Sequence, residues 1–132
     1  MSIERRRLLV IDDDVMVHKV IEAAAQRHGI EVSIAGDGRE GIAFLKENRG
    51  VDLVLVDLLM PFVSGWDVVE FLVKEGQETS PYVVVMSGAP IQEVEKKKIG
   101  SRVDGFMAKD TFSLKRFDAL LSNVFPAKIC AA

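Results

Sequence analysis

An ionisable residue, Asp57, lies within an apolar stretch that reads VDLVLVDLLMP over residues 51–61. A short continuous apolar run of this kind is typical of a strand buried on both faces, as in a parallel sheet. Burying a carboxylate without a partner is costly. If Asp57 ends the strand, its side chain reaches the carboxyl edge of the sheet, where open α/β folds bind their ligands. The stretch therefore predicts either a reactive carboxylate or an aspartate that caps the next turn.

Other polar residues follow apolar runs in the same way, at the ends of further predicted strands. They are Asp12, Asp13, Ser87 and Lys109. Because the carboxyl ends of parallel strands meet at one edge of a sheet, we expect all of these side chains to converge with Asp57. Capping of separate turns does not explain three carboxylates, a hydroxyl and a lysine at a single edge.

The chemistry of such a cluster follows from its charge. Close carboxylates repel one another unless a proton or a cation intervenes. Mg²⁺ suits the cluster because it prefers oxygen ligands and typically takes one or two carboxylates together with phosphate oxygens. Asp57 could then act as a nucleophile toward phosphorus, while Ser87 and Lys109 donate to the phosphoryl oxygens. His18 and His28 both fall on the first predicted helix, so neither is expected to act as a general base, which favours a stored phosphoryl group.

The elements that must position these residues alternate along the chain. Apolar runs predict strands at residues 8–11, 32–35, 53–57, 82–86 and 105–108. Helical spacing predicts helices at residues 15–28, around 42–45, around 68–72, and at 91–99 and 114–124, with residues 36–38 as a turn and 62–65 as a loop. Five strands alternating with five helices indicate an α/β fold with a parallel sheet covered on both faces. A chain of this length suits the flavodoxin-like doubly wound order 2-1-3-4-5.

Length and composition suit one soluble globular domain. The 132 residues are 48% hydrophobic and 28% charged, and the net charge of −3 argues against a nucleic-acid-binding surface. No apolar run approaches the ~20 residues that span a bilayer, and the first residues printed show no apolar segment of signal-peptide type. The single cysteine, Cys130, cannot form an internal disulfide. We therefore expect a single domain over residues 1–132, with its core at about 7–125 and a tail at 126–132. We expect it to act in the cytoplasm, without direct contact with nucleic acid or membrane.

Taken together, these motifs resemble the receiver domain of two-component response regulators. The resemblance extends from about Arg7 to Val124. It rests on LLVIDDD at residues 8–14, DLVLVDLLMP at 52–61, Gly65, VVVMSG at 83–88 and GFMAK at 105–109. Each motif alone is weakly specific, but their combination and spacing are very specific.

The resemblance implies a phosphoacceptor and a metal site. Asp57 would accept a phosphoryl group from a histidine kinase or a histidine phosphotransfer protein. Mg²⁺ would bind to Asp12, Asp13 and Asp57, and the backbone carbonyl of Leu59 would complete the protein ligands.

The resemblance also implies a switch. Ser87 would be the hydroxyl that moves toward the phosphoryl group, Phe106 the aromatic partner that turns inward with it, and Lys109 the contact to the phosphoryl oxygens. The surface formed by the fourth helix, fifth strand and fifth helix would then change its preference for a downstream protein. A phosphorylation-dependent dimer remains open.

Departures from the receiver pattern leave alternatives open. Many receivers follow the lysine with proline, whereas Lys109 precedes Asp110, which leaves the exact placement of Lys109 open. A pseudo-receiver that binds partners without phosphotransfer is therefore one alternative. An aspartate-nucleophile phosphatase is another, but it would carry DxDxT after the first strand, where this chain has contiguous acids at 12–14. A flavin- or nucleotide-binding protein would need a hydroxyl- or glycine-rich loop there.

Two apolar residues flank the predicted site. Leu59 comes two positions after Asp57, and Ala89 comes two positions after Ser87. Neither side chain can hydrogen-bond a water molecule that attacks phosphorus, and such alignment is what hydrolysis requires. The sequence therefore predicts slow self-dephosphorylation.

Overall fold

A computed structural model describes residues 6–48, 50–58, 64–75, 81–88, 103–109 and 113–124. The elements in chain order are β1 (Arg7–Ile11), α1 (Val15–Arg27), β2 (Glu31–Ala35), α2 (Gly38–Glu47), β3 (Leu53–Asp57), α3 (Gly65–Glu75), β4 (Tyr82–Ser87), β5 (Gly105–Ala108) and α5 (Leu114–Val124). All five predicted strands are confirmed to within one residue at each end. The helix predicted at 91–99 and the tail at 126–132 lie outside the described residues.

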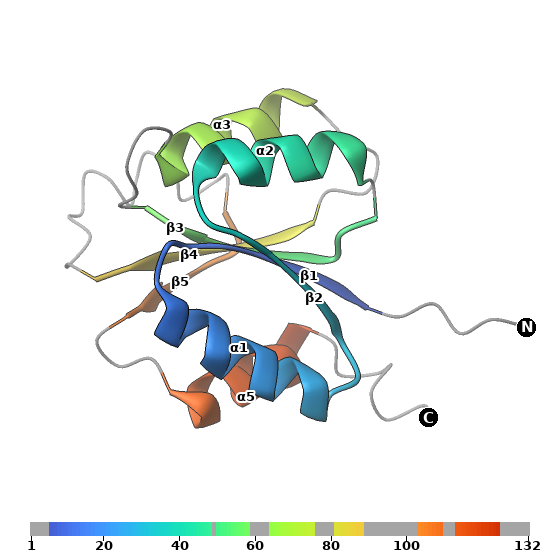
Figure 1. Ribbon diagram of the computed structural model, residues 1–132, viewed down its shortest axis with the longest axis vertical. Coiled ribbons are helices and arrows are strands. Elements are labelled where there is room, and N and C mark those ends of the chain that lie inside the picture. Colours follow the sequence, from blue (N-terminus) through green and yellow to red (C-terminus); the bar gives the residue numbers. More distant parts are fainter. Residues whose placement is uncertain are drawn as a thin grey trace, which may run out of the picture.

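The strands form one parallel sheet in the order β2-β1-β3-β4-β5, which confirms the predicted doubly wound topology. Figure 1 shows that α1 and α5 cover one face of this sheet and that α2 and α3 cover the other. The order changes direction at β1 and β3, the central neighbours. In such folds the crevice at the carboxyl ends of these two strands is the usual place for a ligand.

The register of the strands brings the predicted polar residues side by side. The last residue of β1 pairs with the residue before Asp57, so Asp12 follows at the level of Asp57. Ser87 pairs with the last residue of β5, which Lys109 follows directly. Four residues from four strands therefore reach the same edge, because a parallel ladder keeps all carboxyl ends together.

Successive side chains of each strand point to opposite faces of the sheet and pack into two separate hydrophobic clusters. Below the sheet in Figure 1, Ile21 of α1 and Phe117 and Leu121 of α5 pack against β1, β3 and β4. On the other face, Leu45 of α2 and Val68 of α3 do the same. Every residue of β3 is buried, because both faces of this central strand are covered.

Two helices begin at the last residue of a segment that was predicted as a turn or a loop. Residues 36–38 were predicted as a turn, but α2 begins at Gly38, because the side chain of Asp37 accepts a hydrogen bond from the backbone N–H of Glu40 at 2.9 Å and caps the helix. Gly65 was predicted to end a loop, but it is the first residue of α3. At α1, Asp14 caps the helix through the N–H of Met16.

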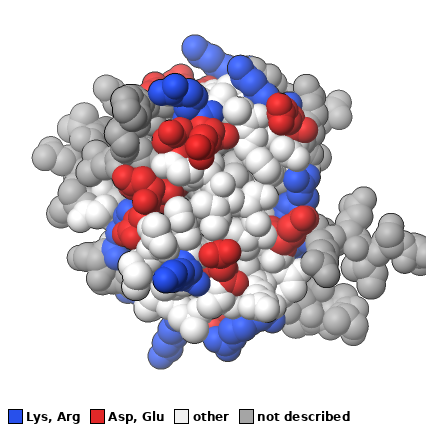
Figure 2. All heavy atoms as spheres, viewed as in Figure 1, with Lys and Arg blue, Asp and Glu red and all other residues white. Residues whose placement is uncertain are grey.

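Acidic and basic side chains are interspersed on the face of the molecule drawn in Figure 2. Among the described side chains, that face shows no continuous basic area of the kind typical of a nucleic-acid-binding surface. Within the described ranges, none of the helices combines the length and apolar character needed to cross a bilayer.

Removing the Phe117 ring should destabilise the domain strongly. Phe117 is fully buried between α1, α5 and the sheet, and Phe→Ala changes in cores cost about 3–5 kcal/mol. We expect Phe117→Ala to lower the free energy of unfolding by that amount in urea titrations. Ser122→Ala, at an exposed position of the same helix, should change it by about 0.5 kcal/mol or less. Equal losses in both variants would contradict this account of the core.

Candidate functional site

Three charged side chains meet at the carboxyl edge of the sheet. The Nζ of Lys109, just after β5, donates to Oδ1 of Asp12 and to Oδ2 of Asp57, at 3.2 Å each. Asp12 is 0% exposed and Asp57 is 3% exposed. One ammonium group thus bridges two buried carboxylates, one from the end of β1 and one from the end of β3.

Asp13 completes an acidic cluster with these two residues. One carboxylate oxygen from each of Asp12, Asp13 and Asp57 lies within 4.8 Å of the others, although Asp13 itself is exposed. Oδ2 of Asp12 is buried and accepts no hydrogen bond from the described residues, although Nζ of Lys109 lies 3.0 Å away. A buried oxygen without a hydrogen bond, among three hard oxygen ligands, fits Mg²⁺.

The electrostatics of the site reflect this burial. Burial raises the pKa of Asp12 above its ordinary value of 3.8, the nearby charge of Asp57 adds to the rise, and hydrogen bonds from Asp14 and Lys109 offset part of it. Burial by itself would lower the pKa of Lys109, but hydrogen bonds and charge from Asp12 and Asp57 raise it on balance above 10.5. Lys109 is therefore a permanent cation at neutral pH.

Ser87 and Phe106 lie on the neighbouring strands. Ser87 is buried at the end of β4, and its carbonyl oxygen accepts from the N–H of Lys109 at 2.8 Å. Phe106 in β5 is 38% exposed. The backbone thus links the serine directly to the bridging lysine, while the aromatic ring keeps access to solvent.

Gly65 allows the backbone around Asp57 to pack closely against α3. Its N–H donates to the carbonyl oxygen of Leu58 at 3.3 Å. A Cβ atom at position 65 would overlap the carbonyl oxygen of Asp57 and would lie 2.8 Å from Cα of Leu58. Any larger residue must therefore displace the end of β3, which carries Asp57. The structure thus gives a steric reason for Gly65, which the sequence analysis used only as part of a motif.

Sequence reasoning missed one residue of this region, His18. Its Nε2 lies 2.6 Å from the backbone oxygen of Asp12. The signal available in the sequence was weak, since a histidine in the second turn of a helix has many ordinary explanations. Three residues with expected effects on the site, Leu59, Ala89 and Asp110, lie outside the described residues.

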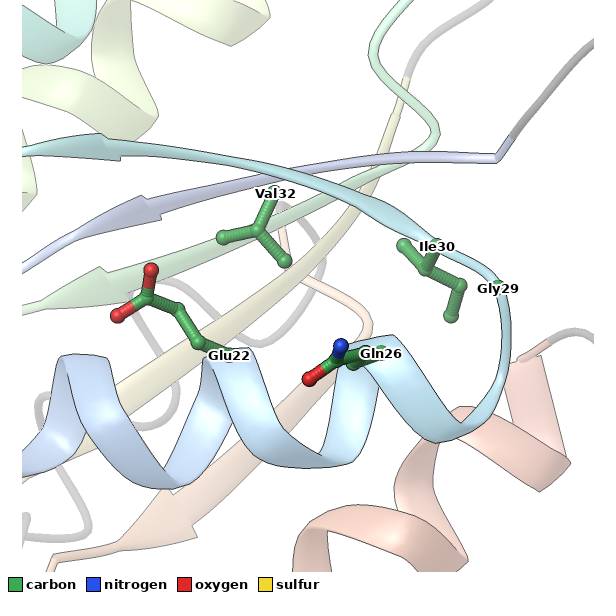
Figure 3. A pocket seen from close by; sticks show the side chains of 5 residues that line it. All are labelled: Glu22, Gln26, Gly29, Ile30 and Val32. Carbon is green, nitrogen blue, oxygen red and sulfur yellow. The ribbon is translucent and has the colours of Figure 1, made fainter.

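A hollow of about 430 Å³ lies far from this edge, where α1 ends and β2 begins. Figure 3 shows its lining side chains, with Glu22 and Gln26 on α1 and Ile30 and Val32 across from them. Of the described residues that line it, one, Glu22, is ionisable. Among these residues there is therefore no cluster of reactive groups comparable to the one at the carboxyl edge.

Comparison with known proteins identifies the family. Residues 8–121 match the response regulator receiver domain. The chain is 30% identical over 118 residues, 89% of its length, to the transcriptional activator protein PfeR of Pseudomonas aeruginosa, and 32% identical over 125 residues to the probable transcriptional regulator ycf27 of Cyanophora paradoxa. It spans 37% and 50% of the lengths of these two relatives. The chain belongs to the response-regulator receiver family, a class of signalling domain in two-component systems.

Solved structures agree on the fold. The receiver domain of the Francisella response regulator 1452 superimposes with a TM-score of 0.77 at 24% identity, covering 91% of this chain and 96% of that one. The chemotaxis response regulator CheY4 of Vibrio cholerae gives a TM-score of 0.79 at 24% identity, covering 92% of this chain and 99% of that one. The sheet order and its helical layers are thus those of receiver domains.

Replacing Asp12 by asparagine should stabilise the protein at pH 7 when no divalent cation is present. The pKa of Asp12 is higher in the folded state than its ordinary value of 3.8, which applies to the unfolded chain. At pH values between these two pKa values, the folded state therefore binds more protons than the unfolded chain. Stability therefore falls as pH rises through that interval, and the loss is complete above it. Asparagine carries no charge, so Asp12→Asn avoids this loss.

The measurement is thermal unfolding of both proteins in chelator-treated buffer from pH 4 to pH 8. The melting temperature of Asp12→Asn should exceed that of the parent at pH 7, and the difference should shrink toward pH 4. Ser122→Ala, at an exposed position of α5, exchanges two uncharged residues, so it serves as the control and should show no such trend. A gain in Asp12→Asn that is independent of pH would refute the burial argument.

Proposed function

We propose that this receiver domain accepts a phosphoryl group on the carboxylate of Asp57. The observation that carries the proposal is the Nζ of Lys109, 3.2 Å from Oδ2 of the buried Asp57, beside the carboxylates of the buried Asp12 and the exposed Asp13. A fixed ammonium group beside a carboxylate nucleophile is suited to stabilise the charge on incoming phosphoryl oxygens.

In the proposed reaction, an oxygen of Asp57 attacks the phosphorus of a phosphohistidine, and the phosphorus–nitrogen bond breaks. The phosphoryl group moves to Asp57 as an acyl phosphate, and the imidazole leaves with the bonding electron pair and takes up a proton. Lys109 would pair with a phosphoryl oxygen, and Ser87 would donate a hydrogen bond to another. Mg²⁺, held by Asp12, Asp13 and Asp57 with the carbonyl of Leu59, would neutralise phosphoryl charge when bound.

The proposed output is a change of binding surface. Ser87 would move toward the phosphoryl group, and the exposed ring of Phe106 would turn inward to occupy the space that this movement leaves. Both residues lie on adjacent, directly paired strands, so a shift at one can reach the other. The face that includes β5 and α5 would then favour a different protein partner, and a second copy of the domain is one such partner.

The proposed input is a histidine kinase or a histidine phosphotransfer protein. Receiver domains work with histidine kinases, and a relative of this chain is described as the DNA-binding response regulator MtrA of Mycobacterium tuberculosis. That likeness covers 54% of this chain and 31% of the relative. DNA binding is therefore a property of that relative. For this chain we propose only that a downstream protein recognises the phosphorylated state, and that both act in the cytoplasm.

Replacing the nucleophile should abolish phosphorylation and leave the fold intact. Asp57→Asn keeps the size of the side chain but removes the carboxylate. We expect the parent to gain one phosphoryl group in acetyl phosphate and Mg²⁺, and the variant to gain none, as measured by intact-protein mass spectrometry. Tandem mass spectrometry after borohydride reduction should assign the modification to position 57.

Asp67→Asn is the matched control and should be phosphorylated like the parent, because Asp67 is exposed in α3. Equal phosphate uptake by Asp57→Asn and the parent would show that Asp57 is not the acceptor. A folded parent that takes up no phosphate from either acetyl phosphate or a phosphorylated histidine phosphotransfer protein would favour a pseudo-receiver instead.

Once formed, the acyl phosphate should decay slowly. Leu59 and Ala89 offer no polar group to align an attacking water, and a positioned acid–base group contributes about 10²–10⁴-fold to such steps. We expect Ala89→Glu and Leu59→Asn to lose phosphate at least about tenfold faster than the parent. Decay is followed by intact mass in Mg²⁺ buffer after removal of the donor. If the parent decays as fast as both variants, these positions do not control water access.

A further inference from the structure

His18 makes a hydrogen bond that the proposed reaction does not use. It lies in α1, and its Nε2 is 2.6 Å from the carbonyl oxygen of Asp12. A carbonyl oxygen can only accept a hydrogen bond, so the imidazole must donate through Nε2–H. The histidine is half-buried, and its bond is made to the backbone of an acidic residue rather than to any carboxylate.

This bond closes a ring of hydrogen bonds between the end of β1 and the start of α1. Oδ1 of Asp12 accepts from the N–H of Asp14 at 2.9 Å. The carbonyl oxygen of Asp14 accepts from the N–H of His18 at 3.2 Å. The imidazole of His18 then returns to the carbonyl oxygen of Asp12. The ring therefore restrains the carbonyl group of Asp12 and both the N–H and the carbonyl group of Asp14.

The peptide unit that His18 holds is the one that joins Asp12 to Asp13. Its orientation sets the direction of the Asp13 side chain relative to that of Asp12, because it depends on ψ of the first residue and φ of the second. The N–H of Asp12 is also fixed, by the carbonyl oxygen of Ala35 at 3.0 Å. Asp12 is thus restrained at its N–H, its carbonyl oxygen and its side chain. The orientation of the exposed Asp13 side chain depends on the peptide unit that it shares with Asp12.

We propose that His18 is a positioning residue for the magnesium site. It fixes the peptide between Asp12 and Asp13, so that the two carboxylates face Asp57 together. It is not a metal ligand and does not touch the phosphoryl group. This role rests on the proposed function, because it concerns the same metal site. Groups that orient metal ligands typically change metal affinity by about 10–100-fold when they are removed.

The test compares three variants at two histidines, His18 near the start of α1 and His28 directly after its end. His18→Leu removes the donor, while His18→Gln retains an amide N–H at a similar distance along the side chain. His28→Leu is the matched control, because His28 also makes a side-chain bond, to Asp118 at 3.1 Å, but at the opposite end of α1. Mg²⁺ affinity is measured by isothermal titration calorimetry without any phosphodonor. The rate of phosphorylation by acetyl phosphate is measured as a function of Mg²⁺ concentration.

We expect His18→Leu to raise the dissociation constant for Mg²⁺ about tenfold or more. The phosphorylation rate of this variant should approach that of the parent at saturating Mg²⁺, since the reacting groups are unchanged. His18→Gln should restore most of the affinity, and His28→Leu should bind Mg²⁺ like the parent even if its melting temperature falls. His18→Asn, whose shorter amide cannot reach the carbonyl, replaces His18→Leu if the leucine variant does not fold.

Two negative results have different meanings. If the parent binds Mg²⁺ and the folded variant without the donor, His18→Leu or its replacement His18→Asn, binds it equally well, the role of His18 is overturned while the proposed function stands. The same holds if His18→Gln loses as much affinity as His18→Leu, since the hydrogen bond is then irrelevant. If the parent itself binds no Mg²⁺, the metal site of the proposed function fails, and the role of His18 fails with it.

Discussion

The bridge from Lys109 to Asp12 and Asp57 is the interaction on which the site depends. Two carboxylates with almost no exposure to water stand within reach of one ammonium group. Buried charges of like sign are tolerated only when a counter-charge and hydrogen bonds compensate for the lost water. Lys109 supplies that compensation at the loop after β5, and thereby ties the ends of three strands into one electrostatic unit.

The compensation is incomplete, and this has a functional consequence. The pKa of Asp12 remains raised by burial despite its bonds to Lys109 and Asp14, and within the described part of the chain its Oδ2 accepts no hydrogen bond. A bound cation stabilises a buried carboxylate with an unfilled hydrogen-bonding position more than it stabilises one whose oxygens all accept hydrogen bonds. The burial that raises the pKa of Asp12 opposes its ionised form, and this supports the proposal that the acidic cluster binds Mg²⁺.

Two contacts from the helices restrain the backbone next to the acidic residues of the site. Gly65 allows α3 to approach the carbonyl of Asp57, where any Cβ atom would overlap it. The hydrogen-bond ring through His18 holds the residues that follow β1. Both restraints act on main-chain atoms next to the acidic residues, and both come from helices that pack on opposite faces of the sheet (Figure 1). The two helical layers thus fix the site from either side.

Hydrophobic periodicity was enough to predict the five strands. Their alternation with helices, together with the chain length, predicted the order 2-1-3-4-5 and the edge at which Asp12, Asp57, Ser87 and Lys109 gather. Each strand is a short apolar run, and parallel connections leave little choice of topology. The raised pKa of Asp12, the close approach at Gly65 and the bond from His18 could not be predicted in this way. They depend on burial, on the distance between two backbones and on one side-chain conformation. Only the packing of segments far apart in the chain decides those quantities.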